Sequence, residues 1–578
     1  MATRKPPTDP AAPARLGPDE REQAWERLGG ETFDLVIIGG GVVGVGAALD
    51  AATRGLRVAL VEARDLASGT SSRSSKLFHG GLRYLEQLEF GLVREALRER
   101  ELMLTRLAPH LVKPVSFLYP LSHRVWERPY TAAGLFLYDT MGGARSVPGQ
   151  KHLSRAGALR MVPALKRDAL IGGIRYYDAQ ADDARHTMMV GRTAAHYGAV
   201  VRPSTQVISF LHEADRVSGV RVRDVEDGRE TNVHAHAVIN ATGVWTDELQ
   251  RLSGSRGRFR VRASKGVHIV VPRDRIVSES GLILRTEKSV LFVIPWRNHW
   301  IVGTTDTDWN LDLAHPAATK NDIDYILNHV NTVLATPLTH EDIEGVYAGL
   351  RPLLAGESES TSKLSREHAV ARVAPGLVAI AGGKYTTYRV MGADAVDAAS
   401  VDIPGRIQQS ITDKVPLVGA DGYHALVNQA DQLATRYGLH PYRVRHLLDR
   451  YGSLVHEVLG SADPDLLKPV PSAPDYLQVE VVYAASHEGA LHLEDVLTRR
   501  TRISIEYPHR GVDCALPVAE LMAKVHNWDE ARIIREVEVY TARVEAERAS
   551  QTEPNDQAAD AVRSAAPEAR PQITEPAG

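Results

Sequence analysis

A glycine-rich turn between two apolar segments is the feature that most limits how this chain can fold. Residues 35–38 are continuously apolar and β-branched, as is typical of a buried strand. They lead into Gly39, Gly41 and Gly44, which give the pattern G-x-G-x-x-G, and an alanine-rich segment follows. A second apolar run at residues 58–61 completes the unit. The order of strand, glycine turn, helix and strand predicts a Rossmann-type dinucleotide-binding fold.

Each glycine of this pattern, and the acid that follows the second strand, has a physical task in binding a dinucleotide. Gly39 allows a tight turn, Gly41 lets the backbone approach a pyrophosphate, and Gly44 lets helix and strand pack closely. The N–H groups and dipole of the helix then face the phosphates. Glu62 ends the second strand, where its carboxylate can accept hydrogen bonds from a ribose. A ligand-free glycine turn would leave Glu62 without a role, so we interpret the unit as a dinucleotide site.

Composition and the termini limit the class of protein further. A chain of 578 residues predicts two or three domains, and a net charge of −4 gives no support to nucleic-acid binding. The single cysteine, Cys514, excludes an intrachain disulfide, a C-x-x-C pair and a cysteine-ligated cluster, which suits a reducing compartment. The N-terminus has no apolar core of a secretory signal, and no apolar run reaches the roughly 18 residues of a spanning helix. We therefore expect a cytoplasmic protein, either soluble or peripheral to the membrane.

The pattern along the chain predicts interleaved domains in an α/β fold. Apolar alternation in "KGVHIVVP", "VLFVIPW" and "WIVGTTD" indicates an antiparallel sheet, and Asp227-Gly228 indicates a hairpin turn. We expect a Rossmann-like domain interleaved with an antiparallel-sheet substrate domain, followed by a helical C-terminal domain. The expected divisions are a flexible segment at 1–31, the Rossmann-like domain at about 32–110, 170–250 and 345–404, the substrate domain at about 111–169 and 251–344, the helical domain at 405–547, and a disordered tail at 548–578, which has little apolar content.

The residues after Glu62 favour a flavin over a nicotinamide cofactor. A nicotinamide enzyme usually continues with alternating strands and helices, whereas residues 63–86 are crowded with hydroxyl and cationic groups. Thr70, Ser71 and Ser75 are short donors that can line a pyrophosphate and a flavin edge. Further along, "INATG" ends a buried strand with a glycine, and "AGGKYTTYR" places a double glycine before a helix. The N-terminus of that helix can lie beneath the anionic end of a flavin.

These motifs together carry a resemblance to a known family. The sequences "GGGVVGVGAALDAATRGLRVALVEARDLASGTSSRSSKLFHGGLRYLE", "INATG", "KGVHIVVP", "FVIPW", "VGTTDTD", "YAGLRPLL" and "AGGKYTTYR" resemble FAD-dependent glycerol-3-phosphate dehydrogenases of the bacterial aerobic, quinone-linked type, over residues 32 to about 540. The resemblance implies oxidation of sn-glycerol 3-phosphate to dihydroxyacetone phosphate on FAD. It also implies electron transfer to a membrane quinone, in the catabolism of glycerol and glycerophospholipids. Two positions depart from the family pattern: Val267 stands where Ser is common, and Tyr385 where Leu is common.

The chemistry of this substrate agrees with the residues that the resemblance assigns. A phosphate dianion needs guanidinium forks, which the family-matched arginines supply, and Lys384 adds a point charge. A secondary alcohol needs a group that takes its proton, and the sequence leaves His79 and His268 open as candidates. The expected catalytic residues are His79, Arg83, Tyr84, His268, Arg351, Arg366 and Lys384. The expected cofactor-binding residues are Gly39, Gly41, Gly44, Glu62, Thr70, Ser71, Ser75, Lys76, Gly243, Gly383, Lys384 and Thr386. No zinc-ligand spacing occurs among the 23 histidines, and no metal is expected.

The sequence leaves two alternative functions open, as well as the role of one segment. A flavoprotein oxidase of the same fold would reduce oxygen to peroxide, and a non-enzymatic FAD-binding protein is disfavoured because cationic and histidine groups converge on the cofactor motifs. Residues 122–143 mix basic and aromatic residues with an apolar cluster, which suits either an anionic membrane surface or a buried helix. The expected partners are glycerol 3-phosphate, a membrane quinone and the inner face of the cell membrane. The sequence leaves a homodimer open.

Overall fold

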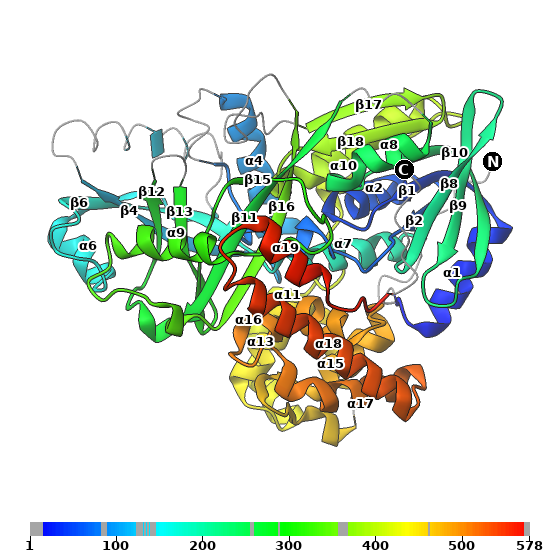
Figure 1. Cartoon of the computed structure of the whole chain (residues 1–578). Helices are drawn as coiled ribbons and strands as arrows, with labels where there is room; N and C mark the ends of the chain where they lie inside the picture. Colours follow the sequence, from blue (N-terminus) through cyan, green and yellow to red (C-terminus); the bar gives the residue numbers. More distant parts are fainter. Residues whose placement is uncertain are drawn as a thin grey trace.

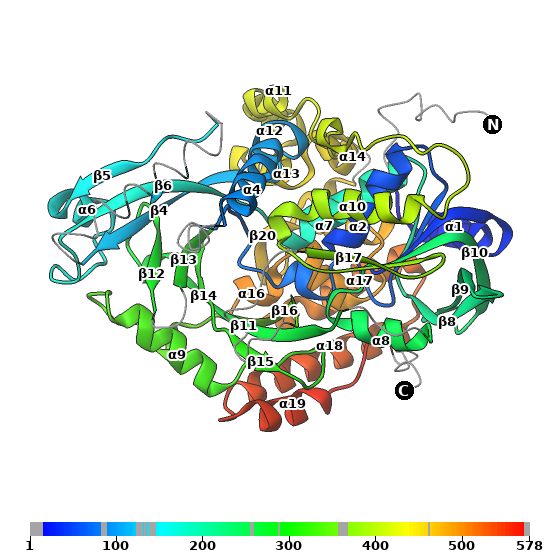
Figure 2. The same ribbon diagram turned by 90° about the horizontal axis from the view of Figure 1, so that it is seen from above.

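The computed structural model describes most of the chain as three packed parts. The described residues are 15–81, 89–122, 131, 134–135, 138, 146–254, 259–286, 290–355, 368–460 and 463–570. In Figure 1 a mostly parallel sheet lies on the right, an antiparallel sheet on the left, and a helical C-terminal domain below them. Figure 2 shows the two sheets side by side from above. The predicted fold class is therefore confirmed.

The mostly parallel sheet contains the glycine-turn unit. Its described strands are β1 Thr32–Ile38, β2 Val58–Val61, β7 Val200–Arg202, β8 Thr205–Glu213, β9 Arg216–Asp224, β10 Glu230–Asn240, β17 His368–Ala374 and β18 Leu377–Gly382. The order β17-β18-β10-β1-β2-β7 places β1 in the interior, paired in parallel with β2 and β10. The apolar run of β1 follows from this position, because both of its faces are covered. β9 and β10 pair antiparallel across the Asp227-Gly228 turn, which confirms the predicted hairpin.

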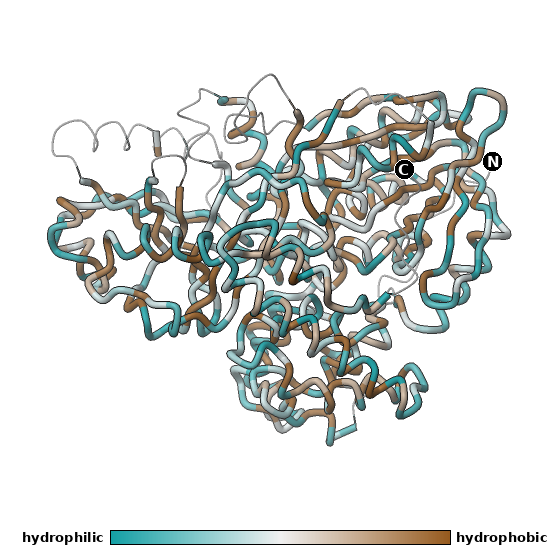
Figure 3. Tube along the Cα trace, in the orientation of Figure 1, coloured by the Kyte–Doolittle hydropathy of each residue, from teal (hydrophilic) through white to brown (hydrophobic). Residues whose placement is uncertain are grey.

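Helices cover both faces of this sheet. The helices of this part are α1 Pro18–Gly30, α2 Val42–Thr53, α7 Asp183–His196, α8 Thr246–Leu252 and α10 Tyr388–Ser400, with α4 Phe90–Leu102 beside them. The apolar faces of α2, α7 and α10 share one buried cluster with β1, while α1 and the β8–β9 hairpin pack on the opposite face. In Figure 3 the hydrophobic segments follow the strands of both sheets.

The second sheet is larger than the sequence predicts. Its described strands are β3 Leu77–Phe78, β4 Lys113–Leu121, β5 Lys151–Ser154, β6 Gly172–Gln180, β11 Val261–Pro272, β12 Gly281–Arg285, β13 Val290–Trp296, β14 His299–Gly303, β15 Thr307–Trp309 and β16 Gly345–Leu354, covered by α6 Arg155–Met161 and α9 Lys320–Asn331. β6 pairs with β4, and β16 pairs with β11 along its whole length. The structure thus places β6 and β16 in this sheet, although the predicted boundaries put both in the Rossmann-like domain. An alternating pattern identifies a strand but not the sheet that it joins.

The C-terminal domain is helical, as predicted, and packs on the Rossmann-like part. Its elements are α11 Tyr423–Asn428, α12 Ala430–Tyr437, α13 Pro441–Tyr451, α14 Val455–Gly460, α15 Gln478–His487, α16 Ile503–Glu506, α17 Ala515–His526, α18 Glu530–Ser550 and α19 Asp556–Ser564, with a short hairpin of β19 Pro469–Val470 and β20 Ala473–Leu477. Buried ion pairs join the two parts: Arg500 contacts both oxygens of Asp65 at 2.7 Å, and Arg499 contacts the same carboxylate at 2.6 Å. Such pairs favour one docking orientation, because separating either partner leaves a buried charge uncompensated.

Both predicted disordered ends are wrong in part. Helix α1 begins at Pro18, with Ala24 and Leu28 buried. The tail is ordered to Arg570: α19 buries Ala559 against Trp309, and Arg570 is 4% exposed. Low apolar content misled the prediction, because this segment docks mainly through hydrogen bonds and ion pairs onto a surface that the rest of the chain has already formed.

Most of the proposed membrane segment, 122–143, lies outside the described residues, including Trp126 and Arg128. Two members of its apolar cluster are described, Leu135 and Tyr138, and both are buried. For these two side chains the packing agrees with the buried-helix alternative. Among the described helices, none combines the length and the apolar character needed to cross a membrane.

Candidate active site

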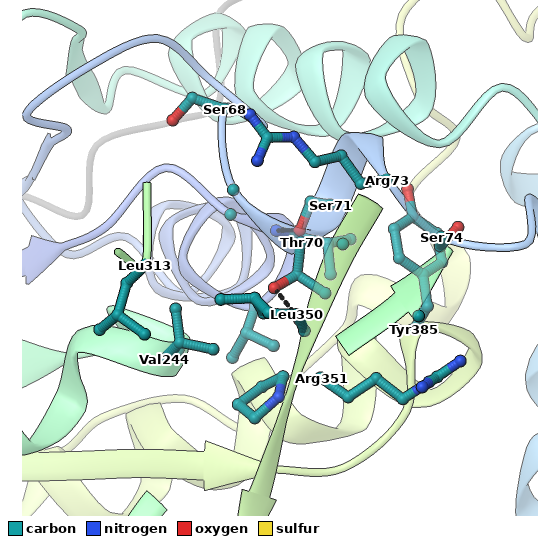
Figure 4. Close-up of a pocket in the computed structure, with 18 of the residues that line it drawn as sticks. Ser68, Thr70, Ser71, Arg73, Ser74, Val244, Leu313, Leu350, Arg351 and Tyr385 are labelled. Atoms are coloured by element: carbon teal, nitrogen blue, oxygen red, sulfur yellow. Dashed lines mark hydrogen bonds between the residues drawn. The ribbon is translucent and has the colours of Figure 1, made fainter. Parts of the chain in front are cut away.

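A cavity of about 1100 Å³ lies between the two sheets. Its walls come from the glycine turn after β1, the end of β2, the loop 68–75, the segment after β10, the face of β11 and β16, and the turn before α10. Figure 4 shows the hydroxyl-rich loop with Thr70 and Ser71 beside the strand that carries Leu350 and Arg351. A cavity of this size at the carboxyl ends of parallel strands can hold a dinucleotide and a small substrate.

The three motif glycines behave as the pattern predicts, but only two reach the cavity. Gly39 has φ +111°, a conformation that favours glycine, and it lines the cavity with Gly41. Gly44 lies behind them: a Cβ there would come within 1.9 Å of the carbonyl oxygen of Gly39. Gly44 therefore serves helix–strand packing, while Gly41 at the N-terminus of α2 presents open backbone to the cavity.

Glu62 lines the cavity and also organises the turn. Its Oε2 accepts a hydrogen bond from the backbone N of Gly40 at 2.6 Å, and its Oε1 accepts one from Arg64 N at 2.8 Å. Burial raises the pKa of Glu62, and the two backbone hydrogen bonds act against that rise. The carboxylate is thus fixed in place and retains lone pairs for a ribose hydroxyl.

The loop after β2 is held by its own hydroxyl groups. Thr70 donates to the carbonyl of Leu350 at 2.5 Å, and Ser71 accepts from the backbone N of Val42 at 2.9 Å. Ser71 therefore ties the loop to the first turn of α2, and Thr70 ties it to β16. Both residues line the cavity, as predicted for cofactor-binding positions.

Lys76 differs from the other predicted cofactor residues, because it faces away from the cavity. It is 1% exposed and donates to Asp183 Oδ1 at 2.7 Å and to the carbonyl of Ser72 at 3.1 Å. Asp183 also accepts from the backbone N and hydroxyl of Ser74, and it pairs with Arg502 of the C-terminal domain. Lys76 thus supports the cavity wall from behind, and the structure does not place it among the lining residues.

His268 is a buried, neutral imidazole in the wall formed by β11. Its Nε2 lies 2.9 Å from Ser75 Oγ, and its ring stacks on Tyr347 with centroids 4.8 Å apart. Burial, then the charges of Arg351 and Lys76, lower the pKa of His268 well below its usual range. Its Nδ1 is buried and has no hydrogen-bond partner among the residues that the structure describes.

Cationic groups reach the same cavity from two elements. Arg351 of β16 donates from Nη2 to Thr304 Oγ1 at 3.2 Å and from Nη1 to the carbonyl of Thr305 at 3.3 Å. Lys384 lines the cavity beside Gly383, which has φ +80° and turns the chain into α10. Arg351 therefore lies near His268, whereas Lys384 lines the cavity at the turn before α10.

The turn before α10 is also bound to the segment that carries His79. Thr386 Oγ1 accepts from the backbone N of His79 at 3.1 Å and donates to its carbonyl at 3.2 Å. The imidazole of His79 lies against Phe292, with ring centroids 6.5 Å apart. His79, Phe292 and Thr386 all line the cavity.

The structure brings most of the predicted residues together. The cavity is lined by His79, His268, Arg351, Lys384, Gly39, Gly41, Glu62, Thr70, Ser71, Ser75, Gly243, Gly383 and Thr386. Arg83, Tyr84 and Arg366 lie outside the described residues, and their roles stay predictions.

Sequence reasoning missed the residues that support the site over long distances. Asp183 anchors Ser74 and Lys76, and Asp65 holds the start of the same loop through Arg500. In "ADDARH" the first acid directly precedes a helix, so the sequence marks Asp182 as a helix cap. Nothing in the local pattern marks Asp183 or Asp65 as a support of the cavity wall.

The residues present fit FAD. Gly41 gives open backbone at a helix N-terminus for a pyrophosphate, and Glu62 gives a fixed carboxylate for a ribose. The fold and this cavity define a FAD-dependent oxidoreductase.

Comparisons with known proteins agree with this class. Residues 34–389 match the family described as FAD dependent oxidoreductase, and residues 410–533 match the C-terminal domain of alpha-glycerophosphate oxidase. The chain is 73% identical over 565 residues to glycerol-3-phosphate dehydrogenase 2 of Mycobacterium tuberculosis, covering 97% of both chains. It is 36% identical over 535 residues to the mitochondrial glycerol-3-phosphate dehydrogenase of Homo sapiens, covering 88% of this chain and 72% of the human one.

A solved structure supports the same assignment. The glycerol-3-phosphate dehydrogenase of Bacillus halodurans, complexed with FAD, has a TM-score of 0.76 and 28% identity, covering 92% of this chain and 98% of that one. The chain belongs to the family of FAD-dependent glycerol-3-phosphate dehydrogenases, and its cofactor is FAD.

A buried histidine beside the site predicts how stability depends on pH. The ring centroid of His186 lies 5.1 Å from the ring centroids of Phe78 and Tyr388, and burial lowers the pKa of His186 to about 3. Below pH 6.5 the unfolded chain binds a proton at this histidine that the folded chain cannot, so the free energy of unfolding falls as the pH falls. This histidine alone should contribute a loss of about 2 kcal/mol between pH 7 and pH 5.

The test is urea denaturation of the wild type and His186→Gln at both pH values. The variant should lose about 2 kcal/mol less than the wild type over this interval, because glutamine does not titrate. Equal pH dependence in the two proteins would show that His186 takes up a proton as readily in the folded state as in the unfolded chain, and would contradict the prediction.

Proposed function

We propose that this protein oxidises sn-glycerol 3-phosphate to dihydroxyacetone phosphate and passes the electrons to a membrane quinone. The observation that carries the proposal is the convergence of Arg351, Lys384 and the neutral His268 on the cavity of the glycine-turn unit. The relatives' names give the substrate, because both relatives compared above are glycerol-3-phosphate dehydrogenases.

In this proposal the cofactor residues have separate tasks. The backbone at Gly39 and Gly41 faces the pyrophosphate, Glu62 accepts from a ribose hydroxyl, and Thr70 and Ser75 complete the wall of the cavity. When bound, FAD accepts the hydride that leaves the carbinol carbon of the substrate.

The phosphate of the substrate binds to Arg351, with Lys384 as a second positive charge. A planar guanidinium can donate two parallel hydrogen bonds to a phosphate, and an ammonium adds attraction without a fixed fork. Contacts with Thr304 and Thr305 hold the guanidinium in place before the substrate arrives, which reduces the entropy lost on binding.

The proton of the substrate hydroxyl goes to a histidine, and the geometry favours His268 over His79. Burial keeps the imidazole of His268 neutral, so Nε2 can accept the proton through Ser75 Oγ, which lies 2.9 Å away on a residue that lines the cavity. His79 lines the same cavity and remains the second candidate.

The electron acceptor separates the proposal from the one alternative that a comparison favours. Residues 410–533 match a domain named for alpha-glycerophosphate oxidase, and an oxidase would pass the electrons to oxygen and release peroxide. The relatives named dehydrogenases, one of them covered over 97% of its length, support an acceptor other than oxygen, and the family resemblance of the sequence implies that this acceptor is a quinone. A quinone in the bilayer requires contact with the inner face of the cell membrane, so we place the protein there, in the cytoplasm.

The experiment measures reduction and reoxidation of the flavin separately. Glycerol 3-phosphate, but not glycerol, should bleach the flavin absorbance under anaerobic conditions. A short-chain quinone should then restore the absorbance far faster than air-saturated buffer does, with little peroxide formed. Rapid reoxidation by oxygen with stoichiometric peroxide would identify an oxidase. Absence of bleaching by glycerol 3-phosphate would remove the substrate assignment.

A further inference from the structure

The C-terminal segment at residues 551–570 reaches the cavity, although it lies far in sequence from every cofactor motif. Ser564 and Glu568 line the cavity together with Arg64 and His315. In Figures 1 and 2, α19 lies beside β15, next to the antiparallel sheet. The end of the chain therefore forms part of the wall around the cofactor space.

Glu568 makes three contacts that join this segment to different parts of the wall. Its carboxylate lies 3.1 Å from Arg64 Nη1, 2.7 Å from His315 Nε2 and 3.2 Å from Arg543 Nη1. Arg64 lies two positions after Glu62, and its backbone N–H donates a hydrogen bond to the carboxylate of Glu62. A continuous set of contacts therefore links Glu568 to the residue expected to bind the ribose.

His315 lies between Arg543, Glu568 and Arg64, with Arg64 Nη1 3.4 Å from its Nε2. Arg543 donates a hydrogen bond from Nη2 to His315 Nδ1. The ring proton is therefore on Nε2, which donates a hydrogen bond to Glu568. Burial, together with the charge of Arg543, lowers the pKa of His315 well below its usual range, so the ring stays neutral. Glu568 stays ionised: burial acts to raise its pKa, but the contacts with His315, Arg543 and Arg64 lower it.

Other contacts hold the segment along its length. The backbone carbonyl of Glu553 accepts from Lys320 N at 2.9 Å, and the carboxylate of Asp560 accepts from Asp312 N at 3.3 Å. At the far end Arg570 donates to Ser204 Oγ at 2.7 Å and pairs with Asp495 at 2.8 Å. Ser204 directly precedes β8, whose first residues line the cavity. The segment thus spans the cavity wall from the loop before α9 to the start of β8.

We propose that residues 551–570 are part of the FAD site, and that Glu568 retains the dinucleotide by fixing Arg64 and His315 in the wall that contains Glu62. Removing the carboxylate frees Arg64 and His315 to move, and the wall at this end of the cavity then opens more readily. The consequence is faster dissociation of FAD, with no change in which substrate is oxidised.

The test is the rate of FAD release from the purified holoenzyme, followed by flavin fluorescence after dilution. Glu568→Gln, which keeps the shape of the side chain, should release FAD about tenfold faster, equivalent to about 1.4 kcal/mol. A chain shortened to end at Ser550 should release FAD faster still. Circular dichroism and thermal melting establish that each variant is folded.

Two control variants make the result specific. Glu480→Gln removes a buried carboxylate of the C-terminal domain that, like the partly exposed Glu568, contacts a histidine and an arginine, His446 at 3.1 Å and Arg450 at 3.5 Å. Gln557→Ala changes an exposed position on α19 itself. Both should keep the wild-type rate. The proposal is overturned if Glu568→Gln releases FAD at the wild-type rate, or if Glu480→Gln accelerates release as much as Glu568→Gln does.

Discussion

Replacing Gly41 with valine is expected to give a folded protein that has lost at least about 99% of its affinity for FAD. The change removes two charge-assisted hydrogen bonds to the pyrophosphate, and a loss of about 1.5 kcal/mol for each raises the dissociation constant by a factor above about 100. A Cβ at Gly41 meets only Ser71 Oγ, at 3.4 Å, so the protein itself has room for the side chain. The same residue lines the cavity at the N-terminus of α2. Valine would therefore occupy the space through which the pyrophosphate approaches the backbone N–H groups.

Two further variants show whether the loss arises from the cofactor space. Gly44→Val should impair folding itself, because its Cβ would lie 1.9 Å from the carbonyl oxygen of Gly39. Gly30→Val adds the same side chain where no heavy atom lies within 4 Å of the new Cβ, and it should bind FAD normally. The measurements are the ratio of flavin to protein absorbance and a titration of the FAD-free protein with FAD. Normal affinity in Gly41→Val would contradict the assignment of this turn to the pyrophosphate.

The dinucleotide unit could be predicted because its determinants are local. Within about 30 residues, β1, the glycine turn, α2 and β2 each follow from residue type and spacing. Glu62 can be predicted for the same reason, since it directly follows β2. The roles of the glycines divide as the pattern requires, with Gly44 in packing and Gly41 at the cavity.

The supports of the site could not be predicted, because they join residues far apart in the chain. Asp65 and Arg500 are separated by 435 positions, and neither belongs to a periodic pattern. Lys76 illustrates the consequence: a lysine beside a hydroxyl-rich loop fits a phosphate site, but Asp183 binds it behind the wall. The partner decides the direction of the side chain, and the sequence does not reveal the partner.

The tail shows a related limit of composition. A segment poor in apolar residues cannot form a core of its own, which is why residues 548–578 were predicted to be disordered. Such a segment can still be ordered by docking, because a folded surface offers charged partners in fixed positions. Glu568 and Arg570 find those partners on three separate parts of the chain. Amino-acid composition indicates whether a segment can form its own core, but it does not indicate whether the segment can dock on a folded surface.

Replacing Arg351 with alanine is expected to lower kcat/KM for glycerol 3-phosphate by a factor of about 150 or more. The guanidinium lies in the cavity wall, where two charge-assisted hydrogen bonds to phosphate would contribute about 1.5–3 kcal/mol each. Arg351→Lys should recover only part of the loss, since an ammonium cannot reproduce the planar fork. FAD content should not change, because the residue is assigned to the substrate.

Substrate selection distinguishes a phosphate contact from general damage to the site. Glycerol lacks the phosphate, so the wild type should turn it over very poorly, and Arg351→Ala should not reduce that low activity further. The ratio of kcat/KM for glycerol 3-phosphate to that for glycerol should therefore fall with the loss of the guanidinium. Arg436→Ala removes the same charge from an exposed position on α12 and should leave both values unchanged. If Arg351→Ala lowers kcat/KM equally for both alcohols, the guanidinium supports the site as a whole and does not bind the phosphate.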